Sequence, residues 1–163
     1  MKINCCQDGK KHDIEVRKTK IIEGSPKVVF SALTEPEKLA EWFQDDADLD
    51  VRVGGRIRLV TIKEKHSEWN LDRDYYMEGT IMEIVPNKRL SYSWEFKDTP
   101  HFPETLVTWE LEQINPNKTL VKLSHVGFSG KEKGNFSVKS HIQGWTEALD
   151  KLAGYCESPR SLK

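Results

Sequence analysis

Residues 75–96, YYMEGTIMEIVPNKRLSYSWEF, carry the pattern that decides the fold of this chain. From residue 90 to residue 96 every second side chain is apolar or aromatic, and those between them are serines and one glutamate. This period of two is typical of a β-strand that buries one face. The sequence PNK at 86–88 interrupts the pattern and predicts a turn. We therefore expect strands over 75–85 and 89–96, paired antiparallel.

The same alternation recurs on both sides of this stretch and predicts further strands. Gly54 and Gly55 lie between two alternating runs, which is a strong signal for a hairpin turn. Consecutive strands that are joined by short turns have to run antiparallel. The further strands are expected over 14–22, 49–53, 56–62, 105–114 and 119–126.

After residue 136 the period of the apolar residues changes from two to that of a helix. The apolar residues then recur at alternating intervals of four and three, which places them on one face of a single long helix. We expect this helix to span 138–157, and Gly144 inside it suggests a close approach to another backbone. The apolar stripe consists of Val138, Ile142, Trp145, Leu149, Leu152 and Cys156.

Two short helices are expected between the first two strands. Ser25 and Pro26 are typical of an N-cap and of the first helical position. Leu39, Trp42 and Phe43 give the second helix an apolar face. The predicted fold class is therefore α+β, with six or seven antiparallel strands packed around one long C-terminal helix.

The length of 163 residues fits one domain, which we place at 13–158 between an irregular lead-in (1–12) and a tail (159–163). Lys and Arg number 25 and Asp and Glu 26, so the formal net charge is −1 and no nucleic-acid surface is predicted. No apolar run reaches the length of a membrane span, and the N-terminus lacks the apolar region of a signal peptide. Because the three cysteines are odd in number and two of them are adjacent, we expect reduced thiols and a cytoplasmic location.

The sequence offers no motif for catalysis, for a metal or for a cofactor. Its five histidines have no close spacing to cysteine or to one another that would suggest a zinc site. It contains no Walker A loop, no dinucleotide-binding glycine motif and no nucleophile elbow. We therefore predict no catalytic residues, no metal and no cofactor.

Short motifs accompany these elements along the chain. They are Pro26-x-x-Val29-Phe30-x-Ala32-Leu33, Leu39-x-x-Trp42-Phe43, Val53-Gly54-Gly55, Gly79-Thr80-Ile81, Arg89-Leu90-x-Tyr92-x-Trp94, His125-x-Gly127-Phe128 and Gly144-Trp145. Together they resemble the helix-grip superfamily of START-like (SRPBCC) lipid carriers, and within it the group named after the Hsp90 ATPase activator. The resemblance covers residues 14–157 and implies a curved sheet and a long helix around an apolar cavity. The polar loop 63–74 looks longer than the usual connection of that family.

Side chains on the inner face of the sheet would line such a cavity. Alternation places aromatic residues there together with Glu78 and His125, and buried ionisable groups are costly unless they are paired or hydrated. Polar groups that converge in an apolar cleft are typical of a ligand site. The aromatic residues could equally fill a packed core, and Glu78 or His125 could face solvent from a bulged strand. The candidate ligand residues are Trp42, Phe43, Tyr76, Glu78, Met82, Tyr92, Trp94, Val107, Trp109, Leu123, His125, His141, Trp145 and Leu149.

Three functions are compatible with the sequence. The first is a binding module for a small hydrophobic or amphipathic ligand. The second, which the resemblance implies, is a stress-response co-chaperone that stimulates the Hsp90 ATPase. In the eukaryotic co-chaperone a separate N-terminal domain does much of the activation, and we expect no room for it in this chain. The third is a cyclase- or hydrolase-like enzyme that uses Glu78 and His125 as an acid and base pair.

Overall fold

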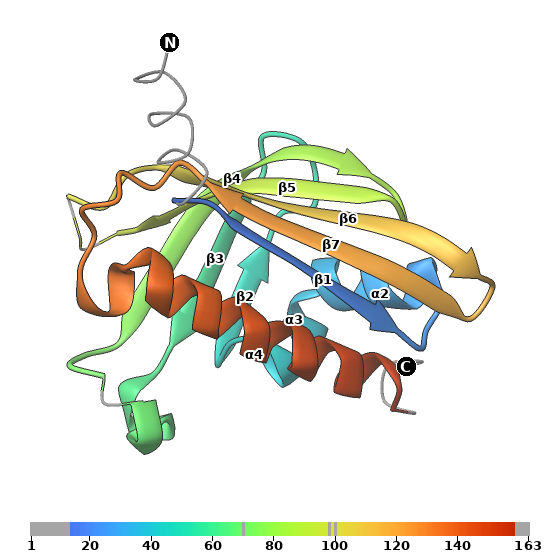
Figure 1. The fold of residues 1–163 in the computed structure, drawn as a ribbon, viewed down its shortest axis with the longest axis horizontal. Helices are drawn as coiled ribbons and strands as arrows, with labels where there is room; N and C mark the ends of the chain where they lie inside the picture. The colour runs from blue at the N-terminus through green and yellow to red at the C-terminus, as the bar shows by residue number, and fades with distance from the viewer. Residues whose placement is uncertain (1–13, 70, 98, 100, 159–163) are drawn as a thin grey trace, which may run out of the picture.

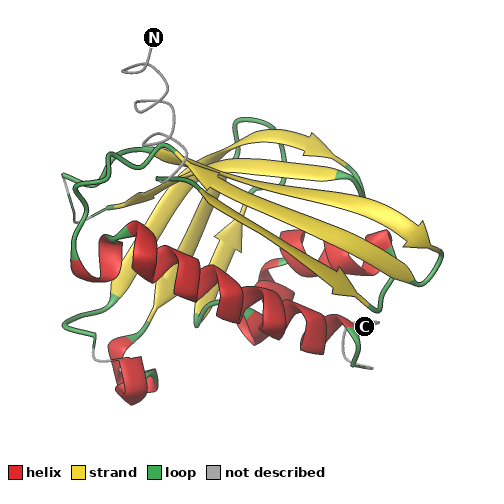
Figure 2. Cartoon of the chain, viewed as in Figure 1, coloured by secondary structure: helices red, strands yellow, loops and turns green. Residues whose placement is uncertain are grey.

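The computed structural model describes residues 14–158 except 70, 98 and 100, so the predicted lead-in and tail lie outside the described residues. A seven-stranded antiparallel sheet curves around one long C-terminal helix (Figure 1). The two short helices lie on the same side of the sheet as the long one and contact it (Figure 2). The prediction of an α+β helix-grip fold is confirmed.

The strands follow chain order across most of the sheet, because a short connection joins most of them to the next. The order is β1-β7-β6-β5-β4-β3-β2, so the first strand pairs with the last, and every pair is antiparallel. The strands are β1 (Val16–Ile22), β2 (Asp46–Leu49), β3 (Arg56–Thr61), β4 (Tyr75–Val85), β5 (Arg89–Phe96), β6 (Thr105–Asn115) and β7 (Lys118–Val126).

Three α-helices occupy the positions that the sequence predicts. α2 (Pro26–Thr34) begins after Ser25, whose side chain accepts a hydrogen bond of 3.2 Å from the backbone N–H of Val28, as an N-cap residue does. α3 (Pro36–Trp42) follows one residue later. α4 (Val138–Cys156) runs along the inner side of the curved sheet (Figure 1).

The hydrophobic core fills the space between the inner face of the sheet and the three helices. Val107 and Trp109 of β6 and Leu152 of α4 are at most 1% exposed. Burial of apolar surface is the dominant favourable contribution to folding. Between α4 and the strands β3, β4 and β5 the filling is incomplete, and a pocket remains.

The face of β4 that turns inward differs from the one that alternation predicts. Met77 and Ile81 are buried, and the pairing with β5 shifts just after Ile81, which marks an irregularity in the strand. Met82 is 56% exposed at this irregularity. Tyr76 and Glu78 alternate with the buried Met77 and therefore point to the outer face. The predictions that Tyr76, Glu78 and Met82 face the cavity are wrong.

The predicted hairpin between β2 and β3 is present, but its turn is longer than expected. Gly54 has a φ of +85°, in the left-handed region that favours glycine. β2 ends at Leu49, and Val51 and Val53 are exposed residues between the strands. The prediction of a strand over 49–53 is therefore wrong in its position.

Candidate ligand pocket

A pocket of about 370 Å³ lies between α4 and the strands β3, β4 and β5. Three charged residues that line it, Glu68, Glu147 and Lys151, are exposed and therefore belong to its rim. Six aromatic rings form part of its wall, together with polar and aliphatic side chains. The six rings are Phe43, Trp69, Tyr75, Trp94, Phe96 and Trp145.

Phe43 reaches the pocket from the C-terminal end of α3. Its ring stacks on that of Trp42 with centroids 4.9 Å apart, and it contacts the ring of Trp145 at 5.6 Å. Trp42 is itself held in place, because its indole N–H donates a hydrogen bond of 2.9 Å to the carbonyl of Ala32. The two short helices therefore position one wall of the pocket.

Trp94 of β5 and Trp145 of α4 are the most buried rings of the wall, with centroids 5.2 Å apart. Aromatic pairs at such distances are favourable. The Nε1 atom of Trp94 is buried and has no hydrogen-bond partner among the residues that the structure describes. That is unusual, because buried N–H groups in proteins are nearly always hydrogen-bonded.

His125 of β7 is a member of a chain of hydrogen bonds that runs from Trp145 to the backbone of Trp94. Its Nδ1 accepts from Trp145 Nε1 at 2.9 Å, so the ring proton sits on Nε2. Nε2 therefore donates to Thr105 Oγ1 at 2.7 Å, and Thr105 donates in turn to the carbonyl of Trp94 at 2.7 Å. Burial, together with the nearby His141, lowers the pKa of His125 to about 2. His125 is thus a neutral, fully hydrogen-bonded residue of the core.

His141 of α4 lines the pocket beside Trp94, with ring centroids 6.2 Å apart. Its Nδ1 donates a hydrogen bond of 2.9 Å to the carbonyl of Ser137. Burial lowers the pKa of His141, although the hydrogen bond to Ser137 and the charge of Glu132 act in the opposite direction. In the neutral ring that results, Nε2 carries the lone pair.

The segment 63–74 between β3 and β4 contributes a further wall through Glu68, Trp69 and Leu71. It contains two short 3-10 helices, η1 (Lys63–Lys65) and η2 (Ser67–Trp69). The sequence pattern presents this segment as a polar loop. In the folded chain its two large apolar residues, Trp69 and Leu71, nevertheless line the pocket.

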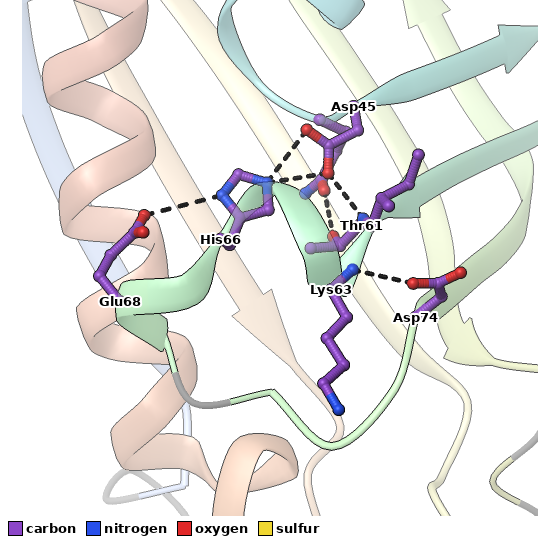
Figure 3. Close-up of polar contacts among 8 residues, drawn as sticks. Asp45, Thr61, Lys63, His66, Glu68 and Asp74 are labelled. Atoms are coloured by element: carbon purple, nitrogen blue, oxygen red, sulfur yellow. Dashed lines mark hydrogen bonds and ion pairs between the residues drawn. The ribbon is translucent and has the colours of Figure 1, made fainter.

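Asp45, which directly precedes β2, holds this segment in place (Figure 3). Its carboxylate accepts hydrogen bonds from His66 Nε2, at 2.8 and 3.0 Å to its two oxygens, and from the backbone N–H of Ile62 at 2.6 Å. The His66 ring then stacks on Trp69, with centroids 3.8 Å apart and planes 1° from parallel. Lys151 Nζ of α4 lies 5.1 Å from the centroid of the same Trp69 ring.

The structure divides the fourteen predicted ligand residues into three groups. Four line the pocket: Phe43, Trp94, His141 and Trp145. Seven are buried in the core without lining it: Trp42, Tyr92, Val107, Trp109, Leu123, His125 and Leu149. Three lie on the outer face of β4: Tyr76, Glu78 and Met82.

Glu78 and His125 cannot work together as an acid and base pair. Glu78 forms ion pairs of 3.4 Å with Arg56 and 3.6 Å with Lys97 on the outer face. His125 is 0% exposed and lies on the inner face. The sheet separates the two side chains, so the prediction that they cooperate in catalysis is wrong.

Gly144 borders the pocket and does not touch another backbone. A Cβ atom placed on it would meet no atom within 4 Å. The prediction of a close backbone approach at this position is therefore wrong. Ile142, two residues earlier, is exposed although it belongs to the predicted apolar stripe.

Among the residues that the structure describes, no three His, Cys, Asp or Glu side chains come together as metal ligands would. No helix in this part of the chain is both long enough and apolar enough to span a membrane.

Comparison with known proteins gives a family match over most of the chain. The model of the family described as Activator of Hsp90 ATPase homolog 1-like protein matches residues 23–157. No curated protein matches the chain.

Solved structures with the same fold come from several organisms. A protein from Chromobacterium violaceum is 20% identical with a TM-score of 0.75, over 90% of this chain and 99% of that one. An HSP90 activator from Plasmodium falciparum is 24% identical with a TM-score of 0.65, over 82% and 89%. The Aha1 dimer from Colwellia psychrerythraea is 19% identical with a TM-score of 0.69, over 88% and 96%. At these identities the likeness shows a shared fold.

Proposed function

Because this chain belongs to the family of Activator of Hsp90 ATPase homolog 1-like proteins, we propose that it acts as a binding module for a small hydrophobic or amphipathic ligand. The observation that carries this proposal is the pocket of about 370 Å³ between α4 and the sheet, with six aromatic rings in its wall. Ligand pockets are typically apolar clefts with a few polar groups that orient the ligand.

The size and the polarity of the pocket limit the ligand. Pockets for drug-sized molecules enclose roughly 300–1,000 Å³, so this one suits a molecule of two or three rings. Glu68, Glu147 and Lys151 at the rim can remain in contact with water while the rings cover the apolar part of the ligand.

Two glycines of α4 offer a matched test. Gly144 and Gly154 both have open space where a Cβ would lie, but only Gly144 lines the pocket. A leucine at position 144 would occupy part of the cavity, whereas a leucine at position 154 would not. Both substitutions should favour the helix, because glycine is a poor helix former.

The probe is N-phenyl-1-naphthylamine, a neutral dye that fluoresces in apolar surroundings. We expect the wild-type protein and Gly154→Leu to bind it alike, and Gly144→Leu to bind it at least about tenfold more weakly, a difference of about 1.4 kcal/mol. Absence of binding by the wild type, or equal binding by all three proteins, would contradict the proposal.

A second candidate function is stimulation of the Hsp90 ATPase. It is supported by the family match and by the shared fold of the Plasmodium falciparum HSP90 activator. A cytoplasmic location and a part in the stress response belong to this candidate. ATP turnover by purified Hsp90 should rise when the protein is added, and an unchanged turnover at saturating concentrations would exclude it.

A further inference from the structure

The indole N–H of Trp94 differs from those of the other tryptophans in the core. Trp42, Trp109 and Trp145 each donate their N–H to an acceptor at 2.9–3.0 Å. Trp94 Nε1 is buried and has no acceptor among the described residues, yet its ring lines the pocket. A buried donor without an acceptor is costly, and a ligand that supplied an acceptor would remove this cost.

A complementary group stands beside it. His141 also lines the pocket, and its ring centroid is 6.2 Å from that of Trp94. Because Nδ1 donates to the carbonyl of Ser137, Nε2 of the neutral ring is an acceptor. Two neighbouring lining residues therefore offer one N–H donor and one nitrogen lone pair.

We propose that the pocket selects a flat aromatic ligand with a neutral hydroxyl group, which accepts a hydrogen bond from Trp94 Nε1 and donates one to His141 Nε2. A hydroxyl group can fill both roles at once, whereas a carbonyl oxygen can only accept. This proposal rests on the proposed function, because it names the ligand class of the same pocket.

The charges around the pocket argue against an acidic head group at this end. The charged lining residues are Glu68, Glu147 and Lys151, and all three are exposed at the rim. No buried lining residue is a lysine or an arginine. A carboxylate that lost its water beside Trp94 would find no compensating charge, which is costly. The six aromatic rings favour a flat aromatic body, because such bodies stack well.

Because Trp94 Nε1 is buried, a ligand reaches it only when a neighbouring side chain moves. Phe43 and Phe96 flank Trp94 at centroid distances of 6.5 and 6.1 Å, and both are only half-buried. A rotation of either side chain leaves the backbone in place. We therefore expect the hydroxyl to reach Trp94 through a change of side-chain rotamer.

Two probes of similar shape separate the hydrogen bond from the apolar contact. 2-Naphthol carries the hydroxyl, and 2-methylnaphthalene replaces it by a methyl group. We expect Trp94→Phe to weaken the binding of 2-naphthol by about 5- to 10-fold and that of 2-methylnaphthalene by less than about 2-fold. The control, Trp69→Phe, changes another ring of the pocket wall and should affect both probes to the same extent.

Equal effects of Trp94→Phe on the two probes would overturn this proposal and leave the proposed function standing. If the wild type binds neither probe, both proposals fail. Should Trp94→Phe not fold, the wild type labelled with ¹⁵N decides the question. The Trp94 indole N–H resonance should move downfield with 2-naphthol and stay in place with 2-methylnaphthalene, and an identical response to both would overturn the proposal.

Discussion

Trp145 of α4 donates a hydrogen bond of 2.9 Å from its indole nitrogen to Nδ1 of His125 in β7. Both side chains are buried, and the bond links the long helix to the inner face of the sheet. It also fixes the tautomer of His125, because the remaining ring proton must point to Thr105. The side chain of His125 thus links α4 to the sheet through hydrogen bonds to Trp145 and Thr105.

Replacement of His125 by leucine should destabilise the protein. The indole N–H of Trp145 and the hydroxyl of Thr105 would each lose a partner in the core, so we expect the free energy of unfolding to fall by about 2–4 kcal/mol. Urea denaturation measures it. In combination with Trp145→Phe the two losses should be less than additive. A loss below about 0.5 kcal/mol would show that the connection is energetically unimportant.

The same histidine predicts a dependence of stability on pH. Its pKa is about 2 in the folded protein and near 6.5 in the unfolded chain, so the unfolded state binds the proton more readily below pH 6.5. The contribution is fully present above pH 6.5 and decreases as the pH falls toward 2, by about 2 kcal/mol at pH 5. His141, whose pKa is also lowered, acts in the same direction.

Urea denaturation between pH 5 and pH 8 checks this dependence. The wild type should lose stability steadily below pH 6.5, and His125→Leu should lose less over the same range. Protonation of carboxylates also lowers the stability of both proteins at acidic pH. The difference between the two curves therefore gives the contribution of His125. Parallel curves would mean that His125 is protonated without cost in the folded state.

Gly79 in β4 should tolerate no side chain, whereas Gly144 should. A Cβ at Gly79 would lie 1.8 Å from the carbonyl oxygen of Ser93, a backbone atom that cannot move aside cheaply. We expect Gly79→Ala to lower the free energy of unfolding by about 2–4 kcal/mol. Gly144→Ala should raise it by up to about 1 kcal/mol, because alanine is the better helix former. Thermal denaturation should show a lower melting temperature for Gly79→Ala and an equal or higher one for Gly144→Ala.

The contrast between these glycines illustrates what the sequence can and cannot predict. The strands 75–85 and 89–96 and the helix that starts at 138 follow from periodicity and turn residues, which are local signals. Gly144 was expected to approach another backbone because glycine is unfavourable inside a helix. The space around it depends on segments distant in sequence, which periodicity does not place.

The wrong prediction of which face of β4 turns inward has a similar cause. Apolar residues occupy both faces of the strand, with Met77 and Ile81 on one side and Tyr76 and Met82 on the other. Alternation alone cannot choose between the two faces. In addition, the irregularity after Ile81 shifts the register between β4 and β5, which interrupts the regular alternation. Of the six rings in the pocket wall, Phe43, Trp94 and Trp145 are among the predicted ligand residues, whereas Tyr75, Phe96 and Trp69 are not. Trp69 was missed, since its polar surroundings resemble an ordinary solvent-exposed loop.

Asp45 should control how firmly the segment that carries Trp69 closes the pocket. Its carboxylate accepts from both His66 and the backbone of Ile62, so Asp45→Ala removes two attachments of that segment at once. We expect N-phenyl-1-naphthylamine to bind about 3- to 10-fold more weakly, mainly through faster dissociation. Hydrogen exchange in residues 63–69 should rise in parallel.

Asp46→Ala is the matched control, because the carboxylate of Asp46 is exposed and accepts a hydrogen bond from the neighbouring Ala47 N–H. This variant should bind the dye as the wild type does. If Asp45→Ala keeps wild-type affinity while exchange in 63–69 rises, the segment loosens without affecting the ligand. Trp69 would then be only a surface residue beside the opening, and the wall that holds the ligand would consist of the rings of α3, α4, β4 and β5 alone.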